Sequence, residues 1–152
     1  MKKEEITPEL TEQETGLLIW QVAGMWERQM KSVLDKNGLT YFQYILMDRL
    51  ALLETKTRPV TQVMLANFAR TDVMMTSKAV RILEEKGWIR RKKDVKDSRA
   101  NQISLTDKGI KRLEKAQELV NATEDEFFGK LDSRLGQFSK NLLKLYQDHQ
   151  VG

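Results

Sequence analysis

The chain has 152 residues, of which 40% are apolar, so it suits one well-packed domain or a small domain with an oligomerisation arm, and it excludes two large independent domains. It contains no cysteine, which excludes disulfides, thiolate metal sites and thiol redox switches. Its net charge of +4 and its pI near 9.3 permit nucleic acid or an anionic membrane as a partner.

Apolar residues recur at helical spacing along the N-terminal third of the chain. They predict a helix from about Thr11 to Lys36, ended by the left-handed turn that Asn37-Gly38 favours. A second helix is predicted from about Tyr41 to Glu54, with Thr40 as its N-cap, and residues 55–59 are predicted as a loop. The inward residues of this second helix are Ile45, Leu46, Leu50 and Leu53.

Two further predicted helices are separated only by a brief turn. The first runs from Thr61 to about Phe68, with Leu65 and Phe68 on its apolar side. The second begins at Asp72 and ends at Gly87, a typical C-terminal stop. In the second helix Thr76, Val80 and Leu83 pack inward, and the opposite face carries Met74, Ser77, Lys78, Arg81 and Glu85.

A basic hairpin follows directly. Its strands are predicted over Trp88 to about Lys93 and over Ala100 to Leu105, where apolar and polar residues alternate. The segment Lys86–Arg99 holds seven basic and two acidic residues, a local charge of +5 against +4 for the whole chain. Positive charge concentrated on one hairpin is typical of a surface that binds a polyanion. The alternative interpretation is that the hairpin tip is basic only because it is solvated.

The last part of the chain is helical again. Thr106 caps a long helix over Asp107–Phe128, and an amphipathic helix covers about Asp132 to Asp148. Two helices joined by a short turn and followed by a basic hairpin have the order of a winged helix-turn-helix. We therefore predict a mainly α fold with a small β-hairpin wing, in which the N- and C-terminal helices form a dimerisation arm.

The exposed face of the fourth predicted helix suits the major groove of DNA, where side chains read base edges. The candidate contacts there are Met74, Ser77, Lys78 and Arg81, and an ordinary solvated face is the alternative. From the hairpin tip, Lys96 and Arg99 are expected to reach the DNA backbone or the adjacent minor groove, with Asp97 orienting the tip. Thr61 and Gln62 are candidate phosphate contacts, because free backbone N–H groups point outward at a helix N-terminus.

The run LEEKGWIRRKKDVKDSRANQISLTDKG, from Leu83 to Gly109, resembles the wing signature of the MarR family of bacterial transcriptional regulators. That signature leads from leucine, charged residues and glycine through Asp-x-x-Asp-Arg-Arg to an alternating strand ending Leu-Thr-x-x-Gly. The matching positions are Asp94, Asp97, Arg99, Leu105, Thr106 and Gly109. Ser98 stands where the family often has the first arginine of its pair, so the resemblance carries no wing contact to that position. The similarity covers roughly residues 39–119.

The resemblance implies one MarR-type domain over residues 1–152, with a DNA-binding lobe at 39–106 and dimerisation helices at 10–38 and 107–149. It implies a homodimer that binds a palindromic operator in double-stranded DNA, with repression as the expected outcome. The apolar faces of the terminal helices also favour a dimer, although packing within one chain is the alternative. These faces comprise Leu10, Leu17, Trp20, Trp26, Leu135, Phe138, Leu142 and Tyr146. The rival hypothesis is a nonspecific or architectural nucleic-acid-binding protein.

Family members commonly bind a small effector between the dimerisation arm and the DNA-binding lobe. A small apolar or aromatic effector bound there is expected to make the protein release its operator. An apolar pocket for it could be lined by Trp20, Tyr41, Tyr44 and Met47. The alternative is that methionine and aromatic residues at helical spacing belong to the core.

No metal site, cofactor or enzymatic activity is predicted. The single histidine, His149, lies near the C-terminus, and the acidic cluster at 124–126 has no nitrogen or sulfur partner. The sequence shows no Gly-rich phosphate loop and no nucleophile beside a histidine. No apolar run approaches the roughly 20 residues of a membrane span, and the acidic N-terminus lacks a signal-peptide core. We therefore expect a soluble, cytoplasmic protein without a membrane partner.

Overall fold

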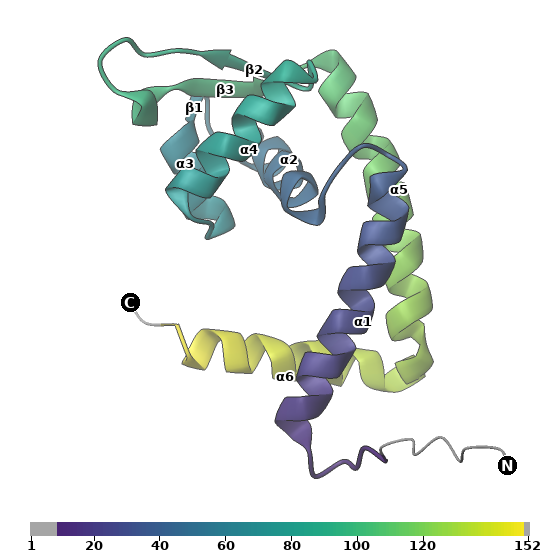
Figure 1. The fold of residues 1–152 in the computed structure, drawn as a ribbon. Coiled ribbons are helices and arrows are strands. Elements are labelled where there is room, and N and C mark those ends of the chain that lie inside the picture. Colours follow the sequence, from purple (N-terminus) through teal and green to yellow (C-terminus); the bar gives the residue numbers. More distant parts are fainter. Residues whose placement is uncertain (1–8, 151–152) are drawn as a thin grey trace, which may run out of the picture.

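Helices form most of the structure, and a small sheet lies at one end (Figure 1). The computed structural model describes residues 9–150, so the first eight residues of the acidic N-terminal segment and the last two residues of the chain lie outside it. The helices are α1 (Thr15–Asp35), α2 (Tyr41–Glu54), α3 (Gln62–Ala69), α4 (Val73–Glu85), α5 (Asp107–Phe128) and α6 (Leu135–Asp148). The strands are β1 (Val60–Thr61), β2 (Ile89–Lys92) and β3 (Gln102–Leu105), and two 3₁₀ helices are η1 (Ser98–Ala100) and η2 (Gly129–Arg134).

Side-chain caps begin the four helices from α2 to α5. The Thr40 hydroxyl accepts the Gln43 N–H while the Gln43 side chain accepts the Thr40 N–H, which forms a capping box. The N-caps of the next three helices are Thr61, Asp72 and Thr106. Gly38 and Gly87, with φ of +73° and +77°, follow the ends of α1 and α4, as the sequence predicts.

The predicted starts of the first and last helices are wrong by a few residues. α1 begins at Thr15 rather than near Thr11, because the Glu14 carboxylate accepts the Thr11 N–H (2.9 Å) in a turn that precedes the helix. α6 begins at Leu135 rather than near Asp132, because Asp132 adopts a φ of +49° that no α-helix tolerates. The intervening 3₁₀ helix η2 turns the chain between α5 and α6.

The sheet has three antiparallel strands in the order β1-β3-β2, whereas the sequence predicts only the two strands of the hairpin. The additional strand pairs Val60 with Ile103 and Thr61 with Gln102. Both hairpin strands are shorter than predicted, and they pair from Ile89 opposite Leu105 to Lys92 opposite Gln102.

One continuous core joins the N-terminal helix to the lobe made by α2, α3, α4 and the sheet. Its fully buried side chains include Met30, Leu34, Leu46, Leu50, Leu65, Val80 and Leu83. Phe68, which the sequence places on the apolar side of its helix, is 37% exposed and does not belong to this core. In Figure 1 α1 and α5 run side by side away from the lobe, and α6 crosses their far end.

These elements confirm a mainly α fold with a winged helix-turn-helix lobe. The hairpin extends beyond the lobe as the wing, and the helices at the two ends of the chain form a separate arm (Figure 1). Among residues 9–150, no helix combines the length and the apolar composition that crossing a membrane requires.

Candidate nucleic-acid interface

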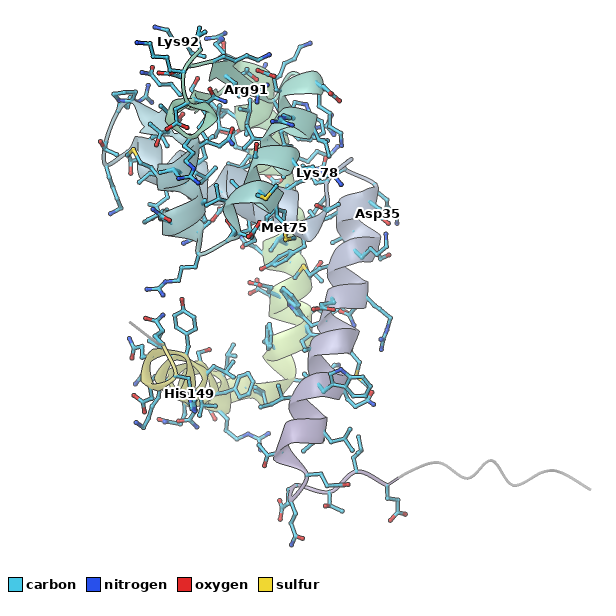
Figure 2. The ribbon with its side chains drawn as sticks, turned by 60° about the vertical axis from the view of Figure 1, so that its left-hand side comes forward. Asp35, Met75, Lys78, Arg91, Lys92 and His149 are labelled. Atoms are coloured by element: carbon cyan, nitrogen blue, oxygen red, sulfur yellow. The ribbon has the colours of Figure 1, made fainter. Side chains whose placement is uncertain are left out.

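Helix α4 has the two faces that its sequence predicts. Thr76, Val80 and Leu83 are fully buried, and Met74 on the other side is 81% exposed. Lys78 and Arg81 are also exposed, and Ser77 is half-buried beside them. Figure 2 shows Lys78 on this outer side, together with Met75, which is exposed but was absent from the predicted contacts.

The turn between α3 and α4 is held by hydrogen bonds that fix the start of α4. The Asp72 carboxylate accepts the Met75 N–H (2.8 Å), and the Thr76 hydroxyl donates to the Asp72 carbonyl (2.7 Å). Because that hydroxyl has only one proton, the Thr71 hydroxyl must be the donor in the 2.7 Å Thr71–Thr76 contact. Arg70 precedes this turn in the left-handed conformation, with φ of +54°.

The wing tip is organised by its two aspartates. The Asp94 carboxylate accepts the N–H groups of Lys96 (2.8 Å) and Asp97 (3.1 Å), and the Asp97 carboxylate accepts that of Arg99 (2.9 Å). The base of the tip is fastened by the Asp94 N–H, which donates to the side chain of the buried Asn101. The side chains of Lys96 and Arg99 remain exposed, so the tip presents two positive charges on an ordered loop.

The basic residues of the hairpin do not all face outward. Arg91 is almost completely buried, and its guanidinium pairs with the Glu84 carboxylate at 3.1 Å, which joins β2 to α4. Figure 2 shows Arg91 within the lobe and Lys92 near its outer edge. The local charge of +5 therefore overstates what a partner would meet.

The two predicted phosphate contacts, Thr61 and Gln62, differ in their surroundings. The Thr61 hydroxyl accepts the Met64 N–H as the cap of α3, at 3.2 Å, and this leaves its own proton to donate. Gln62 is only 3% exposed, and its backbone N–H donates to the Asn101 carbonyl at 2.9 Å. The strand β1 accounts for the burial of Gln62, because it draws the start of α3 against β3.

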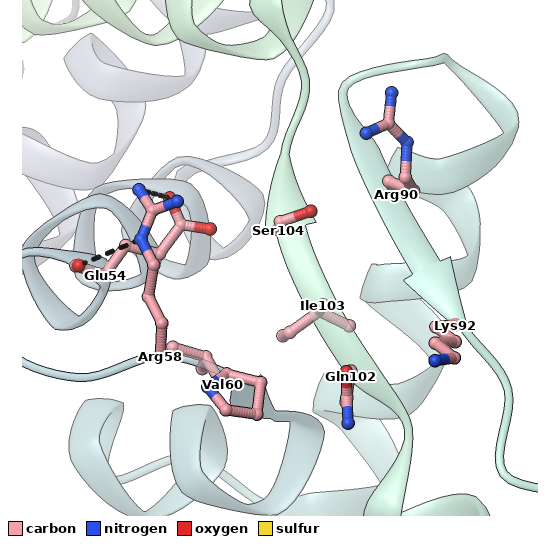
Figure 3. A pocket seen from close by; sticks show the side chains of 9 residues that line it. Glu54, Arg58, Val60, Arg90, Lys92, Gln102, Ile103 and Ser104 are labelled. Carbon is pink, nitrogen blue, oxygen red and sulfur yellow. Dashed lines mark hydrogen bonds and ion pairs between the residues drawn. The ribbon is translucent and has the colours of Figure 1, made fainter.

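A groove of about 410 Å³ lies against the sheet at the point where β1 leaves β3 (Figure 3). Its basic side chains are Arg58, Arg90 and Lys92, and Figure 3 shows the last two on β2 beside Gln102 and Ser104 of β3. The Glu54 carboxylate closes one end, where it accepts the Leu105 N–H at 3.1 Å and faces the Arg58 guanidinium at 3.9 Å. Arg90 and Lys92 are charges of the wing itself, and Glu54 offsets Arg58, so the groove adds no net positive charge to that of the wing.

The residues proposed for an effector pocket do not gather around one cavity. Met47 and Tyr44 belong to the core, whereas Trp20 is 71% exposed on α1. Tyr41 instead packs edge-on against Trp26, with ring centroids 4.7 Å apart. Burial, reinforced by the nearby Asp48, raises the pKa of Tyr44 to about 12.

A different apolar pocket, of about 560 Å³, lies between α1 and the junction of α5 with α6. Its lining includes Leu18, Val22, Trp26, Phe127, Phe128 and Phe138. The indole Nε1–H of Trp26 is buried and has no hydrogen-bond acceptor among the described residues. The sequence prediction missed this pocket because it forms only where the two ends of the chain meet.

The acidic cluster at 124–126 lies on α5, and within residues 9–150 no three or more His, Cys, Asp or Glu residues are grouped so that they could hold a metal ion. Glu124 is half-buried, and this burial is the main reason that the pKa of its carboxyl group is raised. Repulsion from Asp125 raises it further. The His149 ring is exposed, with Nδ1 2.8 Å from the Leu145 carbonyl.

Comparisons with known proteins agree with this geometry. The model of the MarR family matches residues 50–100. A Bacillus subtilis (strain 168) relative, the uncharacterized HTH-type transcriptional regulator YdcH, is 35% identical over 113 residues, which cover 74% of this chain and 77% of the relative.

Two solved structures have the same fold. The S. aureus MepR–DNA complex aligns with a TM-score of 0.75 at 23% identity, over 93% of this chain and 100% of that one. CouR from Rhodococcus jostii RHA1, bound to p-coumaroyl-CoA, aligns with a TM-score of 0.73 at 21% identity, over 95% and 99% of the two chains.

Proposed function

This chain belongs to the MarR family of transcriptional regulators, and on that premise we propose that it binds a palindromic operator as a homodimer and represses transcription there. The observation that carries the proposal is the outer face of α4, which exposes Met74 and two basic residues beside an ordered basic wing. Met74 and Met75 are neighbours and both exposed, and such an apolar patch among basic residues favours contact with a partner surface. The family also makes this chain a regulator rather than an enzyme.

In the proposed complex α4 enters the major groove. Met74 would contact a thymine methyl group, while Ser77, Lys78 and Arg81 would donate to base edges or phosphates. The wing would lie beside that groove, with Arg99 in the minor groove, Lys96 on a phosphate and Asp97 holding the Arg99 backbone. The alternative function, nonspecific or architectural binding, would use the same charges without reading bases.

Competition binding at one fixed salt concentration separates these two functions. The operator is first selected from random duplexes, and its palindrome is then tested against scrambled duplexes of equal length. The proposed regulator prefers its palindrome by a factor of about 10³ or more. A ratio near one would leave only the architectural alternative.

The dimer is proposed from apolar side chains that the described residues leave uncovered. On α1 these include Leu17, Ile19, Trp20, Val22 and Met25, and on α6 they include Leu142, Leu143, Leu145 and Tyr146. Exposed apolar surface on this scale favours association with a second copy, because burying it removes the surface from water.

We expect light scattering at micromolar concentration to give the mass of a dimer. Leu142→Glu, which places a charge on the apolar face of α6, should shift that mass toward the monomer. Lys140→Glu, an exposed position on the same helix, is the matched control and should leave the dimer intact. A monomeric wild-type protein would contradict the proposal.

The 560 Å³ pocket supports a second element of the proposed function, release of the operator by a small aromatic effector. Its size and its apolar lining suit such a molecule. A partner protomer packed on α1 and α6 would close this pocket. Loss of operator binding in the competition assay when an aromatic ligand is added tests this element.

A further inference from the structure

Trp88 is the point at which α4, the recognition helix of the proposed complex, meets the end of α1 and the start of α5. It directly follows the C-terminal turn of α4, and its N–H donates to the Leu83 carbonyl at 3.0 Å. Its own carbonyl accepts the Thr106 N–H at 3.1 Å, immediately before α5 begins. Its ring lies against Gly38, where an added Cβ would come within 3.3 Å of Cη2.

Two cations hold the ring of Trp88 in place. The Arg112 guanidinium of α5 lies 4.8 Å from the ring centroid, and the Lys86 ammonium lies 5.0 Å from it. Both cations also bind the turn between α1 and α2, since Lys86 donates to the Gly38 carbonyl and Arg112 donates to Asn37.

The contact between Arg112 and Asn37 is reciprocal. Arg112 Nη1 donates to the side-chain oxygen of Asn37 at 2.9 Å and to its carbonyl at 3.2 Å, and the Asn37 amide faces the Arg112 carbonyl at 3.4 Å. Asn37 is almost fully buried, so breaking these bonds would leave its polar groups without partners. One guanidinium therefore ties together the end of α1, the start of α5 and the end of α4.

We propose that Arg112, through Trp88 and Asn37, is a positioning residue that sets the angle between the arm and the recognition helix, and thereby the spacing of operator half-sites. The inference rests on the proposed function, because it concerns the separation of two recognition helices in a dimer. With 13 residues, α4 is about 20 Å long. A rotation of about 10° at Trp88 moves its far end by roughly 3 Å, close to the rise of one base pair, about 3.4 Å.

The absence of cysteine allows a direct measurement of this separation. Met74→Cys, at the far and most exposed end of α4, gives one spin label in each protomer, and dipolar spectroscopy without DNA then reports one distance per dimer. Arg112→Met keeps an unbranched, flexible stem but removes the guanidinium. Lys111→Met, an exposed neighbour on the same helix, is the control for the lost charge.

We expect Arg112→Met to shift or broaden the distance distribution by about 3 Å or more, and Lys111→Met to leave it unchanged. Arg112→Lys keeps a cation near Trp88 but loses the paired bonds to Asn37, so its shift in distance should lie between those of wild type and Arg112→Met. This variant replaces Arg112→Met if the methionine variant does not fold. Operator affinity is then measured with unlabelled protein on spacers of different length. The wild type should bind one half-site spacing about tenfold more tightly than spacings one base pair shorter or longer. Arg112→Met should reduce this ratio to about threefold or move the optimum to another spacing.

Failure of the proposed function and failure of the role of Arg112 give different results. If the Met74→Cys protein with Arg112 intact gave no interlabel distance, and the unlabelled wild type had no preferred palindrome, the proposed function would be overturned, and the inference with it. A wild-type protein with both properties, beside folded Arg112 variants of unchanged distance and spacing preference, would overturn the inference alone.

Discussion

Gly109→Ala is expected to lower the free energy of unfolding by about 3 kcal/mol or more, at the upper end of overpacking costs. A Cβ at this position would lie 2.9 Å from the carbonyl carbon of Trp88, and closer still to its oxygen. These are backbone atoms held by the Thr106 N–H, so they cannot move aside as a flexible side chain would. Urea denaturation followed by circular dichroism measures the effect.

Gly136→Ala is the matched control for this substitution. An added Cβ on Gly136, which lies in α6, would meet no atom within 4 Å. Because alanine favours a helix, this variant should be neutral or more stable by about 0.5–1 kcal/mol. Equal unfolding midpoints for the two variants would mean that α5 does not approach Trp88 as closely as described.

Arg99→Ala should weaken operator binding by about 1–3 kcal/mol for each wing, and a dimer loses the contact twice. The Asp97 carboxylate holds the Arg99 backbone, so the exposed guanidinium starts from an ordered loop. Arginine suits a narrow minor groove because its planar, weakly hydrated head loses water more cheaply than an ammonium group. Fluorescence anisotropy with operators altered at the flanking base pairs should show relaxed preference there.

Lys96→Ala is the comparison within the same wing. As a phosphate contact, Lys96 should contribute equally to all duplexes, and its loss should lower the salt slope by about one unit per contact. If Arg99→Ala left affinity and salt dependence untouched in a folded dimer, the wing would be a solvated hairpin without a role in DNA binding.

Local chemistry was sufficient for much of what the sequence predicts. The caps at Thr40, Asp72 and Thr106 act on backbone groups three residues away, and Gly87 ends α4 without help from distant residues. The two faces of α4 likewise follow from helical periodicity alone, so the burial of Val80 could be predicted together with the exposed face opposite. The MarR-type wing motif was readable for the same reason, since its residues are adjacent in the chain.

Only the tertiary structure decided the features that depend on residues far apart in the chain. The two residues of β1 are a strand because β3 offers them an open edge, and this pairing is also what buries Gln62. Arg91 is only seven residues from Glu84, but the two belong to β2 and α4, and only the packing of that strand on that helix brings the charges together. The Leu-Thr-x-x-Gly motif could be recognised in the sequence, but the reason for its glycine could not. A glycine is required at 109 because the backbone of Trp88 packs directly against α5 there, a contact that no local pattern encodes. Periodicity and caps reach about one helical turn along the chain, whereas strand pairing, ion pairing and close packing depend on which distant segments the core brings together.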